Sequence, residues 1–420
     1  MAAKPQAEIK RVVLLMRVSS YRAQPFYQAA ERLGIEIVPG IEMHPDLGDY
    51  WQAPLPLQFE EPDEAVQTIV RYAADNPVQA ILSVDDSASE IAAKASAALG
   101  LTHNSAESAL AARNKYHMRR LFAEGGVPSP KFRLYDMEDD AARAAAEVDY
   151  PCVIKPLLLS GSRGVVRADD AVEFEEAFRW LGRFLATMAR TPGSTQILVE
   201  DYIPGCEVAL EGIIDRGRVR VLALFDKPDP LEGPFFEETI YVTPSRLPAA
   251  IQADIAICAE QAASALGLNF GPVHAELRLN EAGPWLVEMA GRSIGGLCSQ
   301  TLSFGLEGIS LETLILRQAV GLEIDSLARE DKASGVMMIP IPATGILTGI
   351  TGVEAAAATA GVDKVEITAK INYPVTRLPE GDSYLGFIFA QGDDPAWVEQ
   401  ALREAHTKLR FEIMETLTIV

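Results

Sequence analysis

Cysteine is scarce and unpatterned in this chain. Its 420 residues include four cysteines and five histidines, with no C-x-x-C pair and no spacing typical of a zinc site. Reduced thiols are the simplest interpretation, and they favour a cytoplasmic protein. The cysteines are Cys152, Cys206, Cys258 and Cys298.

Long apolar runs are lacking as well. No uninterrupted apolar segment approaches the roughly 18 residues that a membrane-spanning helix needs. The segment Met1 to Lys10 is polar and has no apolar core typical of a signal peptide. We therefore expect neither a membrane span nor a secretory leader.

Basic residues are the minority among the charges. The chain has 37 lysines and arginines against 59 aspartates and glutamates, a formal charge of −22. Such a surface repels nucleic acid and anionic membranes, which bind proteins through clustered lysine and arginine. Any site for a polyanion must therefore supply its own cations and backbone N–H groups.

The motifs of the common nucleotide-binding folds are missing. The pattern G-x-x-x-x-G-K-[ST] is absent, and the first strand-to-helix turn lacks G-x-G-x-x-G. What the first 110 residues do contain is an alternation of apolar strand-like runs and helix-like segments. This alternation predicts a small parallel α/β domain over 1–110. The segments are 11–18, 25–33, 35–38, 64–74, 80–84 and 87–99.

The pattern changes from Asn114 onward. A helix at 115–124 is followed by short strands, a long helix that stops at Gly267, and two further strands. After Glu330 come strand-like runs at 336–341 and 384–389 and a helix that starts at Asp394-Pro395. We expect a second domain over 111–330 and a small α+β lobe over 331–420. The short strands are 152–155, 165–167, 196–200, 207–213, 219–225, 273–279 and 285–289.

The first chemical signal is a lysine before a glycine loop. Lys155 ends a buried strand, and Ser160-Gly161-Ser162-Arg163-Gly164 leads into the next one. Glycine lets backbone N–H groups approach a phosphate, and lysine supplies the compensating charge. A plain hairpin loop with a surface lysine is the alternative.

The second signal follows the strand at 196–200. The segment after this strand, Glu200-Asp201-Tyr202-Ile203, offers backbone groups to the edge of an adenine, and the Ile203 side chain would pack on the adenine ring. The carboxylate of Glu207 could accept hydrogen bonds from two ribose hydroxyls. The alternative is an ordinary strand–turn–strand with solvated acids.

The third signal is a pair of acids. A turn centred on Ala282 would place Leu279 opposite Trp285 and Glu276 opposite Glu288. Facing carboxylates repel each other, whereas a bound Mg²⁺ would make the pair favourable. A different register, with both acids in water, is the alternative.

An arginine follows this pair. Arg292 comes four residues after Glu288, where a guanidinium would neutralise charge on a transferring phosphoryl group or an oxyanion. A helix-capping or salt-bridging arginine is the alternative.

Taken together and in this order, these motifs resemble the ATP-grasp superfamily between Asn114 and Gln318. Within it, the loop from Asp226 to Thr239 resembles the substrate loop of bacterial L-amino acid ligases and carnosine-synthase-like enzymes. The resemblance implies an ATP-grasp fold with an N-terminal parallel α/β domain and a C-terminal α+β lobe.

The resemblance also implies roles for the nucleotide-site residues. Lys115 and Lys155 would contact the α- and β-phosphates. Ser160, Gly161, Ser162 and Gly164 would belong to a mobile loop over the β- and γ-phosphates. Glu200, Tyr202 and Ile203 would form the adenine hinge, and Glu207 would bind the ribose.

Further roles concern the metal and the substrates. Glu276 and Glu288 would hold Mg²⁺, with Mn²⁺ as an alternative ion, and Arg292 would stabilise the acyl phosphate. Glu238 and His274 would line the substrate site, although a histidine satisfied within the core is the alternative for His274. The position of Gly296 is bulky in some amino acid ligases, so glycine implies a roomier pocket.

One position departs from the superfamily. Many ATP-grasp enzymes carry an asparagine metal ligand two residues after the second glutamate, and here that residue is Ala290. Either a second metal ion is held otherwise, or only one ion binds tightly.

The implied activity is an ATP-dependent ligase that joins a small carboxylate to an amine through an acyl phosphate. Amino acids are the expected substrates, and analogy with the family suggests a homodimer. Two alternatives stay open: bicarbonate activation or purine-pathway ligation on the same fold, and a nucleotide-binding module without catalysis.

Overall fold

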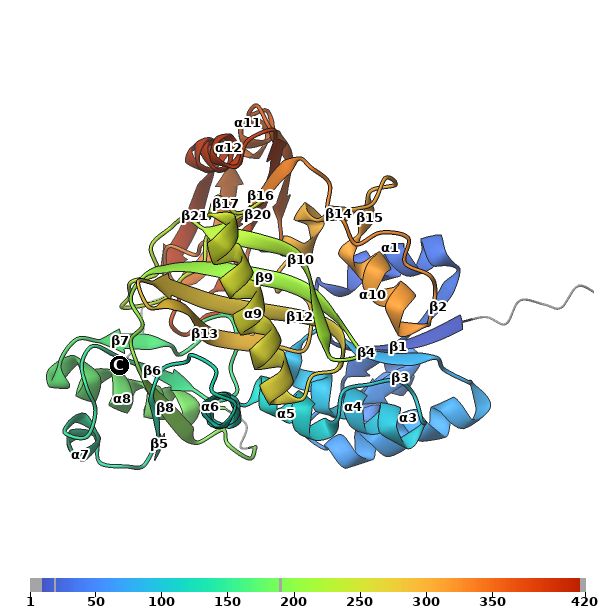
Figure 1. Ribbon diagram of the computed structural model, residues 1–420, viewed down its shortest axis with the longest axis horizontal. Helices are drawn as coiled ribbons and strands as arrows, with labels where there is room; N and C mark the ends of the chain where they lie inside the picture. Colours follow the sequence, from blue (N-terminus) through green and yellow to red (C-terminus); the bar gives the residue numbers. More distant parts are fainter. Residues whose placement is uncertain (1–9, 19, 189–190, 416–420) are drawn as a thin grey trace, which may run out of the picture.

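The computed structural model describes residues 10–18, 20–188 and 191–415. Figure 1 shows three regions arranged around a central sheet. The chain passes through these regions in order, from its blue N-terminal end to its red C-terminal end. Among the described residues, no helix combines the length and apolarity needed to cross a membrane.

The N-terminal region is a parallel sheet with helices on both faces. Its strands are ordered β3-β2-β1-β4, and β1 pairs in parallel with both β2 and β4. The prediction of a parallel α/β region is therefore confirmed. The elements are β1 (Lys10–Arg17), α1 (Ala23–Leu33), β2 (Ile35–Glu42), α2 (Pro45–Trp51), β3 (Leu55–Leu57), α3 (Pro62–Asp75), β4 (Ala80–Ser83), the short 3-10 helix η1 (Asp86–Ala88), α4 (Ser89–Ala98) and α5 (Ala106–Arg113).

The next region is a four-stranded antiparallel sheet covered by one long helix. Its strands are ordered β5-β8-β6-β7, and the amphipathic α8 buries Phe174, Phe178 and Leu181 against them. The preceding helix α6 begins where the Asn114 side chain accepts from the N–H of Tyr116 at 3.0 Å. The elements are α6 (Lys115–Glu124), β5 (Phe132–Asp136), α7 (Ala141–Ala145), β6 (Cys152–Pro156), β7 (Val166–Ala168), α8 (Ala171–Leu185) and β8 (Gln196–Asp201).

The central sheet has eight strands, ordered β13-β12-β9-β10-β11-β16-β20-β18. Helix α9 lies diagonally across one face (Figure 1), where Ile255, Ala259 and Ala262 join the core with strand residues such as Leu277. The elements that complete this part are β9 (Cys206–Asp215), β10 (Arg218–Lys227), β11 (Ile240–Thr243), α9 (Ala249–Leu266), β12 (Phe270–Asn280), β13 (Gly283–Ala290), η2 (Cys298–Thr301), β14 (Ser303–Phe304), β15 (Ile309–Ser310) and α10 (Leu311–Ala319).

The C-terminal region continues this same sheet. Strand β16 pairs antiparallel with β11, so the ladder crosses the boundary expected near residue 330. Helix α12 starts at Asp394, whose side chain caps it as predicted. The division of the chain into three domains stays a prediction. The elements are β16 (Ala333–Ile339), β17 (Gly345–Thr351), α11 (Val353–Ala357), β18 (Val362–Ile367), β19 (Pro374–Val375), β20 (Gly386–Gly392), α12 (Pro395–Lys408) and β21 (Arg410–Glu415).

The N-terminal region is joined to the centre by apolar packing. Phe26 and Ala29 of α1 share a buried cluster with Leu311 and Leu314 of α10. This packing sets the carboxyl ends of β1 and β4 beside the segment that follows β13. Parallel α/β sheets place ligand sites at such strand ends.

Candidate active site

A cleft between the β6–β8 sheet and strands β12 and β13 gathers most of the predicted site residues. Gly296 lies outside it and lines an adjoining cavity, and Gly164 lines neither space. The predicted residues that line the cleft are Lys115, Lys155, Ser160, Gly161, Ser162, Glu200, Tyr202, Ile203, Glu207, Glu238, His274, Glu276, Glu288 and Arg292.

The two acids of the central hairpin face each other. Glu276 pairs with Glu288 in the β12–β13 ladder, and both side chains line the cleft, so this predicted pairing is confirmed. The prediction that Leu279 faces Trp285 is wrong. The turn is one residue shorter than expected, with Asn280 opposite Gly283, so Leu279 pairs with Pro284. A bulge that leaves Val287 without a partner then brings Glu288 opposite Glu276.

Each of these acids also contacts a lysine. Glu288 lies 3.3 Å from Lys115 Nζ, and Glu276 lies 3.6 Å from Lys227 Nζ. Burial raises the pKa of Glu276, and the neighbouring carboxylates Glu207 and Glu288 add to this shift while Lys227 opposes it. The two lysines thus offset only part of the cost of ionising Glu276 in this position.

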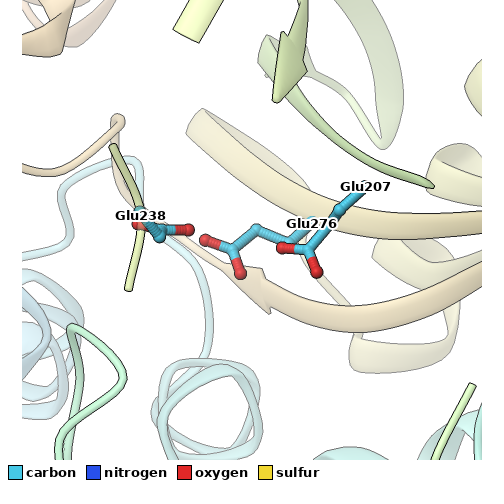
Figure 2. Close-up of side chains that lie close together, drawn as sticks. All are labelled: Glu207, Glu238 and Glu276. Carbon is cyan, nitrogen blue, oxygen red and sulfur yellow. The ribbon is translucent and has the colours of Figure 1, made fainter. Parts of the chain in front are cut away.

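Two further carboxylates lie next to Glu276. Figure 2 shows the side chains of Glu207, Glu238 and Glu276 directed toward one space, and one oxygen of each lies within 4.8 Å of the others. Carboxylate oxygens are the donors that Mg²⁺ prefers, but the Lys227 ammonium lies among these three carboxylates. The fit to a hard dication therefore rests on the facing pair Glu276 and Glu288, which both line the cleft.

Lys227 lies among these three acids and was missed from the sequence. Its Nζ is 2.7 Å from Glu207 and donates also to Glu238. Burial alone would lower the pKa of Lys227, but the surrounding carboxylates outweigh it and raise that pKa well above the ordinary value. The available signal was that Lys227 ends a buried strand, as Lys155 does.

Lys155 belongs to a buried ion cluster. Its Nζ lies 2.6 Å from Glu200, which also forms an ion pair with Arg119 and accepts a hydrogen bond from Arg119 Nη2 at 3.3 Å. Burial lowers the pKa of Lys155, with Glu200 opposing the shift. Burial alone would raise the pKa of Glu200, but Arg119 and Lys155 outweigh it and the pKa falls. The Glu200 carboxylate is thus held by protein cations, and any hinge role falls to its backbone.

Arg119 could have been found from spacing. It lies four residues after Lys115 on α6, and residues at that spacing share one face of a helix. Lys115 itself donates to the carbonyl of Leu159 at 2.8 Å, directly before the glycine loop. One face of α6 therefore carries both cations toward the cleft.

Arg278 organises the predicted adenine hinge. Its guanidinium donates to the Ile203 carbonyl at 2.8 Å and to Glu207 at 3.1 Å. The ring of Tyr202 lies between Arg278, 5.0 Å from its centroid, and Arg167, 4.2 Å away. Two stacked guanidinium groups hold the ring in place. Arg278 was not predicted, although it lies two residues after Glu276 on the same strand face.

The glycine loop between β6 and β7 is attached to the C-terminal region. The N–H of Gly164 donates to the Pro379 carbonyl at 2.8 Å, and Arg163 Nε donates to the Glu380 carbonyl at 2.7 Å. Gly161 and Gly164 adopt φ of 64° and 74°, which other residues rarely adopt. Glycine is thus required by the shape of the loop.

Arg292 pairs with an acid of the N-terminal region. Its Nε and Nη2 lie 2.9 and 2.8 Å from Asp86 Oδ2. Burial alone would raise the pKa of Asp86, but Arg292 outweighs it and the pKa falls. The Asp86 contact fixes the guanidinium at the junction of the cleft and the adjoining cavity.

His274 and Gly296 both line the adjoining cavity, and their substrate roles stay predictions. The buried His274 also has the satisfied contact that the alternative, a core histidine, expects. His274 lines both spaces, and its Nδ1 lies 3.1 Å from Glu211, whose carboxylate also accepts from the N–H of Ile294. Gly296 has φ of +61°, and a Cβ there would lie 3.0 Å from the Phe387 ring. A larger residue would therefore displace Phe387 or fill the cavity.

Comparisons with known proteins agree with this arrangement. Three families match in order, described as the ATP-grasp N-terminal domain over 27–103, the ATP-grasp domain over 148–301, and the L-amino acid ligase C-terminal domain 2 over 337–414. In a crystal structure, the L-amino acid ligase from Bacillus licheniformis has a TM-score of 0.81 and 26% identity, covering 97% of this chain and 99% of that one.

Two curated relatives are similar over part of their length. Alanine–anticapsin ligase of Bacillus subtilis is 30% identical over 268 residues, 60% of this chain and 56% of the ligase. Uncharacterized protein y4rH of Sinorhizobium fredii is 25% identical over 311 residues, 71% of this chain and 61% of that protein. The chain thus spans less than two thirds of either relative.

These findings define the class of protein. The chain belongs to the ATP-grasp superfamily, and it resembles the L-amino acid ligases over nearly its whole length.

Proposed function

We propose that the chain is an ATP-dependent carboxylate–amine ligase acting on amino acids or similar small substrates. One arrangement carries the proposal: the facing acids Glu276 and Glu288 lie beside Lys115, in a cleft that meets a second cavity at Arg292. A nucleotide site that adjoins a separate charged cavity suits transfer of a phosphoryl group to a second molecule.

The nucleotide would occupy the cleft. Lys115 and Lys155 would contact its phosphates, under the loop of Ser160, Gly161, Ser162 and Gly164. The hinge at Tyr202 and Ile203 would take the adenine, and Glu207 the ribose. Mg²⁺, if bound by Glu276 and Glu288, would neutralise charge on the phosphate oxygens.

The proposed reaction has two steps. The carboxylate of the first substrate attacks the γ-phosphorus of ATP, so an acyl phosphate forms and ADP leaves. The amine of the second substrate attacks the acyl carbon, the C–N bond forms, phosphate leaves, and the nitrogen releases a proton. Positioning and charge neutralisation carry such transfers, and Arg292 would stabilise the negative oxygens in both steps.

Several accompanying points are proposals by analogy with the family. They are a homodimeric state, Mn²⁺ as an alternative ion, and the division into regions 1–110, 111–330 and 331–420. A cytoplasmic location is proposed from the free state of all four cysteines.

The test is a phosphate-release screen over all pairs of the twenty amino acids, with mass spectrometry of the products. We expect release that requires both partners, and loss of that release in Glu288→Gln. Glu281→Gln, which changes an exposed glutamate in the turn of the same hairpin, is the matched control. ATP binding without turnover for any pair would favour a non-catalytic module, and bicarbonate-dependent release would favour another ATP-grasp chemistry.

A further inference from the structure

Arg22, at the start of α1, is a cation that the proposed reaction does not yet use. Its Nη2 donates to the carbonyl groups of Ser293 and Ile294, at 3.1 and 2.8 Å. Among the ion pairs of the described residues, none includes Arg22, and the nearby Asp86 is bound to Arg292. Its remaining guanidinium donors have no carboxylate partner within the described part of the chain.

The cavity that Arg22 lines adjoins the nucleotide cleft. It has a volume of about 500 Å³ and shares Glu238, His274, Glu276 and Arg292 with the cleft. Arg292 lines both spaces, whereas Arg22 lines the cavity and not the cleft. The two guanidinium groups thus lie at different distances from the proposed site of phosphoryl transfer.

Arg22 lacks an ion-pair partner of its own among the described residues. Burial lowers the pKa of Arg22, and the positive charge of Arg292 lowers it further, while Asp85 and Asp86 oppose the shift. Asp86 itself is paired with Arg292. A guanidinium presents a planar fork of donors that matches a carboxylate, so a substrate carboxylate in the cavity would give Arg22 a partner.

We infer that Arg22 binds the non-reacting carboxylate of the amine substrate, which is therefore an amino acid rather than a simple amine. The reacting carboxylate of the other substrate must lie at the cleft, next to ATP, and Arg292 is the guanidinium at that junction. Two other arginines line the cavity, Arg17, which lies 3.4 Å from Glu42, and Arg113. Arg22 is the one held by the carbonyl groups of Ser293 and Ile294, next to Arg292, so we assign to it the carboxylate that remains free in the product. The inference rests on the proposed ligase activity and assigns one specificity-determining residue to it.

The experiment uses a productive pair from the phosphate-release screen and the carboxamide of its amine partner. With the wild-type chain we expect KM for the carboxamide to exceed KM for the amino acid by about 10- to 100-fold, the effect of losing one charge-assisted pair. In Arg22→Gln, KM for the amino acid should rise by a similar factor. The preference for the amino acid over its carboxamide should disappear, and KM for ATP should stay unchanged.

Two control variants distinguish a role of Arg22 in substrate binding from a role in holding the Ser293–Ile294 backbone. Arg32→Gln removes an exposed arginine from the same helix and should leave every constant unchanged. Arg22→Lys, which keeps the charge, should retain part of the preference. An equal effect of Arg22→Gln on both acceptors, or a fall in kcat alone, would indicate a role in holding the Ser293–Ile294 backbone and overturn the inference.

The two proposals fail differently. A wild-type chain that accepts the carboxamide as well as the amino acid overturns the assignment of Arg22 and leaves the ligase activity standing. Absence of amine-dependent phosphate release for every pair overturns the ligase activity, and the assignment of Arg22 with it.

Discussion

Glu276→Gln should stabilise the chain while removing its activity. Glu276 stands directly opposite Glu288 in the β12–β13 ladder, and like charges in that position destabilise a strand pair. Burial raises the pKa of Glu276, so its ionised form is disfavoured in the folded state. Glutamine keeps the shape of the side chain and removes the charge.

The size of the effect follows from two opposing changes. Relief of cross-strand repulsion contributes about 0.2–1 kcal/mol. Against this, the substitution removes one long ion pair, 3.6 Å to Lys227, and a 3.5 Å contact with His274 Nε2. Lys227 keeps Glu207 and Glu238 as partners, so its charge stays neutralised. We expect a net stabilisation below about 1 kcal/mol, which for a chain of 420 residues is a rise in Tm of at most about 1 °C.

The sign of the pH dependence follows from the same shift. A carboxyl group whose pKa is raised by folding costs stability above its unfolded pKa, near about 4.3, and costs nothing once it is protonated in both states. The stabilisation by Glu276→Gln should therefore be present at neutral pH and vanish at about pH 4 and below.

The assay is thermal unfolding without nucleotide or divalent metal, run beside phosphate release. We expect the order of Tm to be Glu276→Gln above wild type, with the exposed-site control Glu281→Gln equal to wild type. A Tm of Glu276→Gln several degrees below wild type would refute the reasoning, because the acid would then be a structural ion-pair partner rather than one kept for a ligand.

Three further outcomes follow from other contacts. Glu200→Gln should destabilise the fold by about 3–5 kcal/mol in urea unfolding, because it leaves Arg119 and Lys155 buried without their carboxylate. The control Asp201→Asn, which changes the neighbouring, partly exposed acid, should not lower the free energy of unfolding by this amount. Arg163→Ala, which frees the glycine loop from the Glu380 carbonyl, should raise KM for ATP several-fold and leave Tm within a few degrees; an unchanged KM would contradict this. Burial raises the pKa of the Cys152 and Cys258 thiols to about 12, so these thiols should react slowly with a thiol reagent at pH 8. The reagent should modify the exposed Cys206 first in the native chain, and all four cysteines after denaturation.

The sequence predicts those parts of the structure that depend on neighbours in the chain. Helix α9 ends at Gly267, which has φ of 71°, and the Asp394 side chain caps α12 as expected. The pairing of Glu276 with Glu288 was expected from one short turn, but the observed turn alone would place Val287 opposite Glu276. The bulge that brings Glu288 there is not predicted, because the identity of Val287 gives no sign that it lacks a partner.

The sequence does not predict how the site balances its charges. Lys155 was identified from its position at a strand end and Lys115 from the family resemblance, but their partners, Glu200 and Glu288, come from distant segments.

The same limit explains the residues that were missed. Arg22 and Asp86 approach Arg292 only because α1 packs on α10, and apolar residues far apart in the sequence produce that packing. A local pattern indicates that a cation is required, whereas only tertiary packing decides which acids oppose it and which guanidinium is left to bind a substrate.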